Sequence, residues 1–222
     1  MEIVLVGYFL INICQIFSLG GFLTNLTIVK VCSLKSLTRP NIQWFSAIQI
    51  GLITATIWVL FLNALIGFQW LDDGTPQSLL LVWGSALIFF IGVGYIAADT
   101  GFAWTSEFQN YDPSNLRNIA LYVLYLLFPL ICLVAYFVLE AYIVLKVLGE
   151  RRPLYILTGA ALCFAIGQIF DFVISVHICN STDGKIDGSP FETLFVLLSV
   201  VLLWWFWINI VEGEHSENEA SY

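Results

Sequence analysis

Asp72 and Asp73 form the first pair of side chains with the potential for chemistry. Two neighbouring carboxyl groups serve acid–base catalysis when their surroundings push their pKa values apart. Here they lie in the short polar stretch WLDDGTP, and no basic or metal-binding residue is close by in the sequence. We therefore interpret the pair as an exposed acidic turn rather than as a catalytic dyad.

Three further ionisable residues, Glu140, Asp171 and His177, lie within long apolar runs. Such groups at membrane depth are often functional and face the interior of a bundle. Lys146 is close enough to Glu140 for snorkelling or local pairing, and His177 has no metal-binding neighbour one turn away. Asp171 is expected to be a structural carboxylate that accepts hydrogen bonds from Gln168, a hydroxyl group or water. The alternative is that Asp171, Glu140 and His177 line the polar path of a small transporter or channel.

The sequence lacks the short motifs of the common enzyme classes. It contains no H-E-x-x-H, G-x-S-x-G or G-K-[ST] segment, and its five cysteines form no C-x-x-C pair. Its eight Lys and Arg residues are too few to form the basic patch that nucleic-acid binding needs. We therefore expect no enzymatic activity, no cofactor, no metal site and no nucleic-acid partner.

The composition indicates an integral membrane protein. The 222 residues are 59% hydrophobic and only 11% charged, and the mean hydropathy is +0.89, whereas soluble domains carry about 25% charged residues. The apolar runs are continuous and reach the roughly 20 residues that a spanning helix needs. We predict an all-α polytopic bundle of six transmembrane helices over 3–29, 43–69, 78–98, 116–145, 154–178 and 191–211.

The boundaries of these helices follow from charged residues, glycine and proline. Asp72 and Asp73 cannot stay in hydrocarbon, Gly74 permits a turn, and Pro76 suits the first turn of the next helix. Pro129 predicts a kink in the fourth helix. Residues 1–211 form one bundle domain and residues 212–222 an acidic tail. The N-terminus has Glu2 in place of a basic region, so we do not expect a cleaved signal peptide.

Two signals disagree about the orientation. The loops after the first, third and fifth helices lie on one side of the membrane and contain five basic residues, whereas the loops on the other side contain three. Because basic residues are enriched in cytoplasmic loops, this count would place the loops after the first, third and fifth helices in the cytoplasm. The sequon at Asn180 lies in the loop after the fifth helix, and a glycosylated asparagine must face the lumen, which favours the opposite orientation.

The apolar helices also contain residues that favour helix packing. Ala47-x-x-x-Gly51 and Gly94-x-x-x-Ala98 offer small-residue faces. Gln49, Asn63 and Gln168 are amides that can bridge helices, and packing within this bundle is the simplest use of all of them. A last group, Trp204, Trp205 and Trp207, fits an interfacial belt, which is the commoner case, a lipid-facing surface or a partner surface.

An ordered set of residues between about 43 and 207 resembles the fungal chitin synthase export chaperones. Its most specific part is the segment Gly67-Phe68-Gln69 with Asp73-Gly74-Thr75-Pro76. The other members, in order, are Gln49–Leu52, Trp58, Asn63, Ser78, Arg152-Pro153, Gly167-Gln168, Ile178-Cys179, Asp187-Gly188 and Trp207. Typical members begin with a longer, cysteine-containing segment and have about one more helix, so the chain looks like a shortened or divergent member. Asp171 stands where the family pattern is apolar.

The resemblance implies a multi-pass protein of the endoplasmic reticulum membrane. Such a protein helps a polytopic chitin synthase to fold and to leave for the cell surface, with its C-terminus in the cytosol and Asn180 in the lumen. Our hypothesis is that the bundle holds the client's transmembrane helices within the lipid bilayer. A permanent accessory subunit of the synthase remains the alternative. The candidate contacts are Asn63, Gly67, Phe68, Asp72, Asp73, Gly74, Thr75 and Gln168.

The tail contains a second candidate signal. Glu212 and Glu214 form an acid-x-acid pair of the kind that vesicle coat adaptors read as an exit signal. A solubilising acidic end is the alternative.

Overall fold

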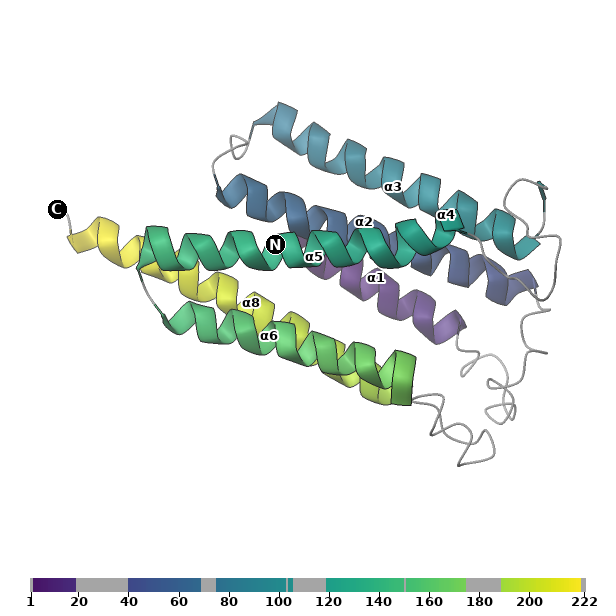
Figure 1. Ribbon diagram of the computed structural model, residues 1–222. Helices are drawn as coiled ribbons and strands as arrows, with labels where there is room; N and C mark the ends of the chain where they lie inside the picture. Colours follow the sequence, from purple (N-terminus) through teal and green to yellow (C-terminus); the bar gives the residue numbers. More distant parts are fainter. Residues whose placement is uncertain are drawn as a thin grey trace. The chain divides into compact units, whose positions relative to one another are not determined.

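The computed structural model describes residues 2–18, 40–68, 75–102, 104–105, 119–149, 151–174 and 189–220 (Figure 1). Every regular element within these stretches is helical, which confirms the predicted all-α fold. The elements are α1 (Glu2–Ser18), α2 (Pro40–Gly67), α3 (Pro76–Phe102), α4 (Ile119–Tyr122), η3 (Val123–Leu127), α5 (Phe128–Tyr142), η4 (Ile143–Leu148), α6 (Arg152–Ile169), η5 (Phe170–Ile174) and α8 (Ser189–Ala220). The η elements are π-helical.

Five helical stretches are long and apolar enough to cross a membrane: 44–67, 76–102, 120–146, 152–169 and 190–210. They match the predicted second to sixth spans. The described apolar part of α1, Glu2–Ile16, is shorter than a span, and the rest of the predicted first span lies outside the described residues. Helix α3 continues past the predicted end at residue 98 to Phe102, and α8 continues into the predicted tail as far as Ala220.

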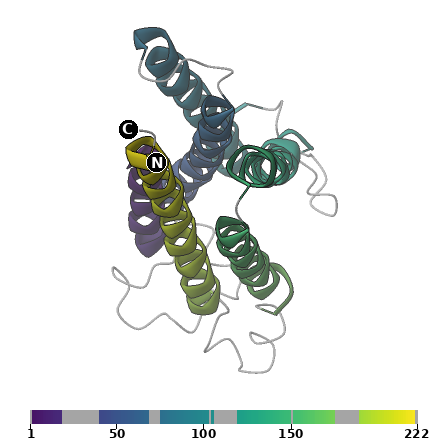
Figure 2. The same ribbon diagram turned by 90° about the vertical axis from the view of Figure 1, so that its left-hand side faces the viewer.

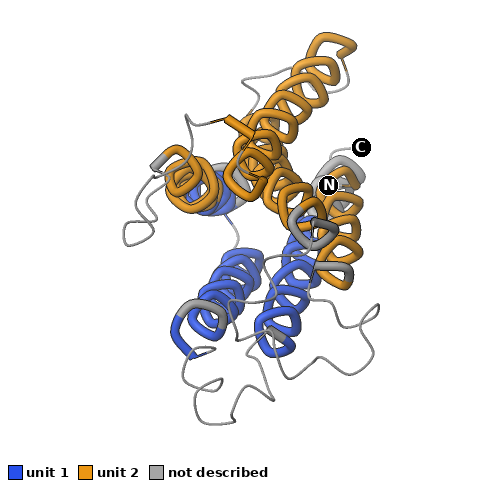
Figure 3. The backbone as a smooth tube through the Cα atoms, turned by 90° about the vertical axis from the view of Figure 1, so that its right-hand side faces the viewer, with its two compact units in different colours: residues 1, 137–222 blue, residues 2–136 orange. Residues whose placement is uncertain are grey.

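The chain divides into two compact units, which Figure 3 colours separately. Residues 2–136 form the N-terminal unit, and residues 137–222, with residue 1, form the C-terminal unit. The division falls within α5. The prediction of one bundle domain over residues 1–211 stays a prediction.

Helices α2 and α3 of the N-terminal unit pack through the small residues that the sequence suggested. A Cβ atom built on Gly51 would lie 2.8 Å from the carbonyl oxygen of Phe90 and 3.4 Å from the Cα of Gly94. Ala47 and Ala98 are buried together in the same contact. Close approach of the two backbones therefore depends on the absence of larger side chains.

Helix α1 approaches α2 at another glycine. A Cβ atom on Gly7 would overlap the hydroxyl oxygen of Thr56 and lie 3.1 Å from its methyl carbon. The N-terminal unit thus has close glycine contacts on two sides of α2.

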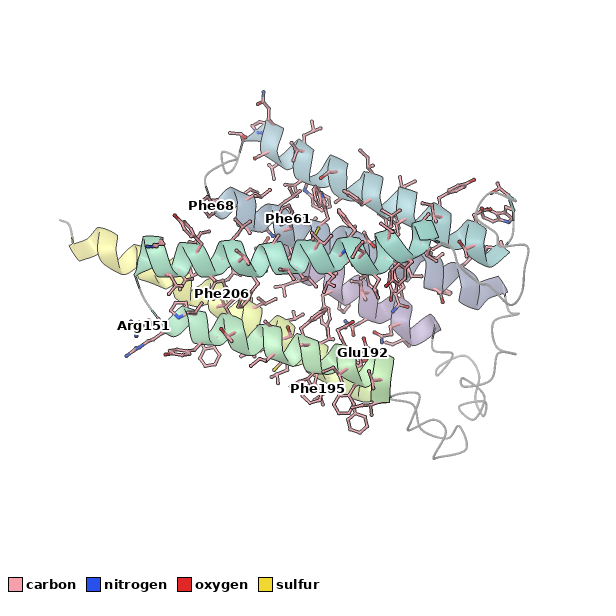
Figure 4. All side chains as sticks on the ribbon, in the orientation of Figure 1. Phe61, Phe68, Arg151, Glu192, Phe195 and Phe206 are labelled. Atoms are coloured by element: carbon pink, nitrogen blue, oxygen red, sulfur yellow. The ribbon has the colours of Figure 1, made fainter. Side chains whose placement is uncertain are left out.

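Helices α6 and α8 form the antiparallel pair of the C-terminal unit (Figures 1 and 2). A Cβ atom on Gly167 would lie 3.4 Å from the carbonyl oxygen of Glu192. Phe170 stacks on Phe191 and Phe195, with ring centroids 5.6 and 5.4 Å apart. Figure 4 labels Glu192 and Phe195 at this end of the pair.

The fourth span changes its helical period next to its proline. Pro129 has no N–H to donate to the carbonyl four residues earlier. The preceding element, η3, is π-helical, and the Phe128 N–H bonds the carbonyl of Val123, five residues back. The predicted kink position at Pro129 therefore coincides with a π-turn, one of the established causes of helix kinks.

The fourth span ends at a left-handed glycine. Gly149 has φ of 66°, and α6 begins at Arg152 with Pro153 in its first turn. A glycine favours the left-handed conformation, and proline fits the start of a helix. The glycine and the proline therefore mark the end of one helix and the start of the next.

We predict that Gly51→Ala lowers the stability of the protein. The added methyl group would force α2 and α3 apart against the Phe90 carbonyl, which should cost about 1–3 kcal/mol. Thermal unfolding in mild detergent measures this loss. Gly84→Ala is the matched control in α3, because nothing lies within 4 Å of its added Cβ. Equal effects of the two substitutions would contradict the packing interpretation.

Candidate partner-binding site

The candidate site is the end of the α2–α3 hairpin that carries the acidic turn. Asp72, Asp73 and Gly74 lie outside the described residues, but the structure describes both helices up to the turn. At the end of α2, the Phe68 N–H bonds the carbonyl oxygen of Ala64 at 3.0 Å. Phe68, labelled in Figure 4, is half-buried, and Gly67 is exposed.

Thr75 caps the N-terminus of α3. Its hydroxyl oxygen accepts the Ser78 N–H at 3.3 Å, and its carbonyl oxygen accepts the Ser78 hydroxyl at 2.9 Å. The Leu79 N–H also bonds the Thr75 carbonyl, at 3.1 Å. A threonine at this position satisfies backbone groups that the first helical turn leaves free. Thr75 thus stabilises the start of α3, a role that was not predicted from the sequence, where it was proposed as a contact residue.

Asn63 lies one turn before the end of α2 and on the same face as Gly67. Its side-chain nitrogen is buried and has no hydrogen-bond partner among the described residues. Two other helical asparagines behave differently: Asn12 donates to the Tyr8 carbonyl and Asn209 to the Trp205 carbonyl, each at 2.8 Å. Asn63 is therefore an amide donor that its own helix does not satisfy.

Trp58 ties α2 to α3 and α5. Its indole N–H donates to the hydroxyl oxygen of Ser85 at 2.9 Å. Its ring lies 4.9 Å from that of Phe89 and 5.7 Å from that of Phe128. The sequence analysis noted Trp58 only within the resemblance. Its aromatic neighbours Phe89 and Phe128 lie on two other helices, so no regular spacing in the sequence indicates that they contact Trp58.

Asp99 is a polar residue whose role the sequence analysis missed. The predicted third helix ends at residue 98, yet Asp99 lies within α3 and is completely buried. It accepts the backbone N–H of Thr105 at 2.7 Å and the Thr105 hydroxyl at 2.5 Å. Hydrogen bonds from two donors offset the cost of burying a carboxylate. The only signal in the sequence is a threonine six residues further on.

The interpretation of Glu140 as a snorkelling residue is wrong. Only 3% of Glu140 is exposed, whereas Lys146 is exposed. Residues six positions apart fall on different faces of a helix. Glu140 shares the buried face of α5 with Cys132 and Tyr136, as the inward orientation of membrane-embedded ionisable groups would lead one to expect.

The remaining candidates are only partly described. Gln168 is half-buried beside Gly167 in the α6–α8 contact. The backbone of Asp171 belongs to η5, but its side chain, His177 and Asn180 lie outside the described part. Glu212 and Glu214 lie on the helical backbone of α8, and their side chains are likewise not described. Within the described residues, no group of three His, Cys, Asp or Glu side chains is placed to hold a metal ion.

The chain matches the family model described as chitin synthase export chaperone over residues 1–220. Among the similar proteins is a chitin synthase export chaperone of Cryptococcus neoformans var. neoformans, 32% identical over 77% of this chain and 46% of the relative. The protein of that name from Coccidioides immitis is 33% identical over 77% of this chain and 50% of the relative. The one from Chaetomium globosum is 30% identical over 85% and 56%, respectively.

The chain spans about half the length of the curated relatives that it matches. No solved structure matches it.

We predict that Ser85→Ala destabilises the protein through Trp58. The substitution leaves the indole N–H without its acceptor in a half-buried site, at a cost of about 1 kcal/mol. A double-mutant cycle with Trp58→Phe, followed by thermal unfolding in detergent, isolates this bond. Ser85→Ala should cost less when Phe occupies position 58. An unchanged cost in that background would show that the bond contributes nothing.

Proposed function

The chain belongs to the chitin synthase export chaperone family, and we propose on that basis that it binds a polytopic chitin synthase in the endoplasmic reticulum membrane. There it promotes the folding of the synthase and its export to the cell surface. Its C-terminus lies in the cytosol and Asn180 in the lumen. The observation that carries the proposal is the family match over nearly the whole chain.

The apolar character of the helices supports binding of the client within the bilayer. Five helical stretches are long enough to span it, and many of their large apolar side chains point outward, including Leu80 and Ile88, which are 74% and 73% exposed. Lipid tails are as apolar as these side chains, so association with another helix depends on packing and on interhelical hydrogen bonds. Polar groups that the chain leaves unsatisfied therefore decide where a client helix binds.

Asn63 is the group that fits this role in the N-terminal unit. A buried donor without an acceptor costs about 1–3 kcal/mol, and a bilayer core supplies no water to satisfy it. We propose that the half-buried Asn63 side chain turns outward, so that a carbonyl, hydroxyl or amide oxygen of a client transmembrane helix accepts its N–H. Gly67, one turn away on the same face, has no side chain to keep that helix at a distance.

The acidic turn extends this contact to the membrane surface. Asp72 and Asp73 follow Gly67 and Phe68 directly, and the Thr75 cap fixes the start of α3 on the other side of the turn. We propose that the turn contacts the polar end of the bound client helix on the cytosolic side. Gln168, beside the close α6–α8 contact, is a second candidate contact in the C-terminal unit.

We predict that Asn63→Leu weakens co-purification of the client chitin synthase in mild detergent. Loss of one interhelical hydrogen bond, worth about 1–2 kcal/mol in model peptides, corresponds to a loss of affinity of about five- to thirty-fold. Leucine has a similar size and removes an unsatisfied donor, so thermal stability should be unchanged or higher. Replacing Asp72 and Asp73 by asparagine should weaken co-purification as well.

Asn209→Leu is the matched control for this experiment, because Asn209 bonds its own helix. It should leave co-purification unchanged. Full capture of the synthase by the Asn63→Leu protein would contradict the assigned contact. Failure of the unaltered chain to capture any chitin synthase would contradict the proposed function itself. A pulse–chase version distinguishes the two lifetimes: a chaperone releases its client, and a permanent subunit stays bound.

We also propose that the Glu212-Gly-Glu214 segment is read by vesicle coat adaptors. Its support is the acid-x-acid spacing at the cytosolic end of the last span. Deleting residues 212–222 should then reduce delivery of the synthase to the cell surface while leaving co-purification intact. A tail of equal length and charge in which no two acids are spaced by one residue should behave like the deletion. Normal delivery of the synthase by the deletion variant or by the variant with the rearranged tail would show that residues 212–222 only solubilise the end of the chain.

A further inference from the structure

Three aromatic rings cluster at the end of the α2–α3 hairpin opposite the acidic turn. The ring of Trp44 lies 4.9 Å from Phe102 and 5.3 Å from Trp104. Phe102 and Trp104 are 5.3 Å apart and nearly parallel, at 11°. One membrane-spanning stretch begins at Trp44 and another ends at Phe102. The cluster therefore lies at one end of both candidate spans.

Asp99 and Thr105 hold this cluster in place. The buried Asp99 carboxylate binds the backbone N–H and the hydroxyl group of Thr105, and Trp104 is the residue next to Thr105. The two bonds hold Thr105 against the last turn of α3, and the neighbouring Trp104 stacks on Phe102. A carboxylate near the C-terminus of a helix is opposed by the helix dipole. The two hydrogen bonds from Thr105 offset that cost.

The two indoles of the cluster differ from the indole in the interior of the unit. Trp58 donates its N–H to Ser85, whereas no described residue accepts the N–H of Trp44 or Trp104. Trp44 is 44% exposed and Trp104 is 53% exposed. An indole with one face packed and an N–H that no described residue accepts suits a boundary that is apolar on one side and wet on the other.

We propose that Trp44, Phe102 and Trp104 form an anchor for the lipid interface. The indole N–H groups donate to the ester carbonyl and phosphate oxygens of the lipids, and the stacked rings fill the boundary with the acyl chains. Asp99 and Thr105 act as positioning residues that preset the anchor. The anchor fixes the depth of the α2–α3 hairpin in the bilayer, and the proposal does not depend on the identity of any client.

The depth of Trp104 tests the anchor. The full chain is reconstituted into phosphatidylcholine vesicles whose lipids are brominated either beside the ester or midway along the acyl chain. The emission lost in Trp104→Phe, relative to the unaltered chain, gives the signal of Trp104 alone. Trp58 is the control, because it lies about 21 Å along α2 from Trp44 and therefore near mid-chain depth in a hydrocarbon core about 30 Å thick; its signal is obtained in the same way from Trp58→Phe. The expected result is stronger quenching of Trp104 by bromine beside the ester and of Trp58 by mid-chain bromine.

Equal quenching of Trp104 by the two lipids, or stronger quenching by mid-chain bromine, would overturn the anchor. Absence of quenching by either lipid would overturn it too, because the ring would then lie outside the bilayer.

Variants of Thr105 test the positioning pair. Thr105→Val keeps the shape of the side chain but loses its hydroxyl donor, so the preference of Trp104 for shallow bromine should weaken. Thr105→Ser keeps both donors and should preserve that preference. Thr158→Val is the control, since the Thr158 hydroxyl bonds only its own helix at Leu154. An undiminished preference in Thr105→Val would remove Asp99 and Thr105 from the proposal, and a loss of preference in Thr105→Ser or Thr158→Val would do the same.

Discussion

The absence of water in the hydrocarbon core is the constraint on which this structure depends. Polar side chains in the described helices meet it mainly with partners inside the chain. Thr54 and Thr158 donate to carbonyl groups of their own helices, Trp58 donates to Ser85 on the next helix, and Asp99 accepts both donors of Thr105. Asn63 and Trp207 depart from this pattern, because no described residue accepts the Asn63 amide N–H or the Trp207 indole N–H. Of the two, Asn63 lies beside the acidic turn, which makes it the stronger contact candidate.

Much of the fold could be predicted because its signals are local. Continuous apolar runs locate the spans, and the turn residues at Gly149 and Pro153 end one helix and start the next. The small-residue faces at Gly51 and Gly94 identified the α2–α3 contact, because glycine and alanine allow helices to approach within a membrane. The family resemblance, built on an ordered set of residues, agrees with a match over residues 1–220.

What could not be predicted depends on which side chains contact one another or on helix phase. A hydropathy argument ends a span at the first carboxylate, so it ended the third helix before Asp99 and could not anticipate the donors at Thr105. Glu140 and Lys146 appeared close in the sequence, but they lie on different faces of the helix. For the candidate site, the sequence predicted which residues take part but not their contacts. The lack of an acceptor for Asn63 and the capping role of Thr75 became visible only in the structure.

The π-turn before Pro129 gives the fourth span two angular phases. Each extra residue in a turn rotates the following side chains by about 100° relative to an unbroken α-helix. The face that Leu121 presents toward Ala47 and Ala98 is therefore not continued by the same sequence period beyond Phe128. A single amphipathic wheel drawn over the whole span would mix two surfaces, and removal of one residue from this turn would rotate every side chain that follows.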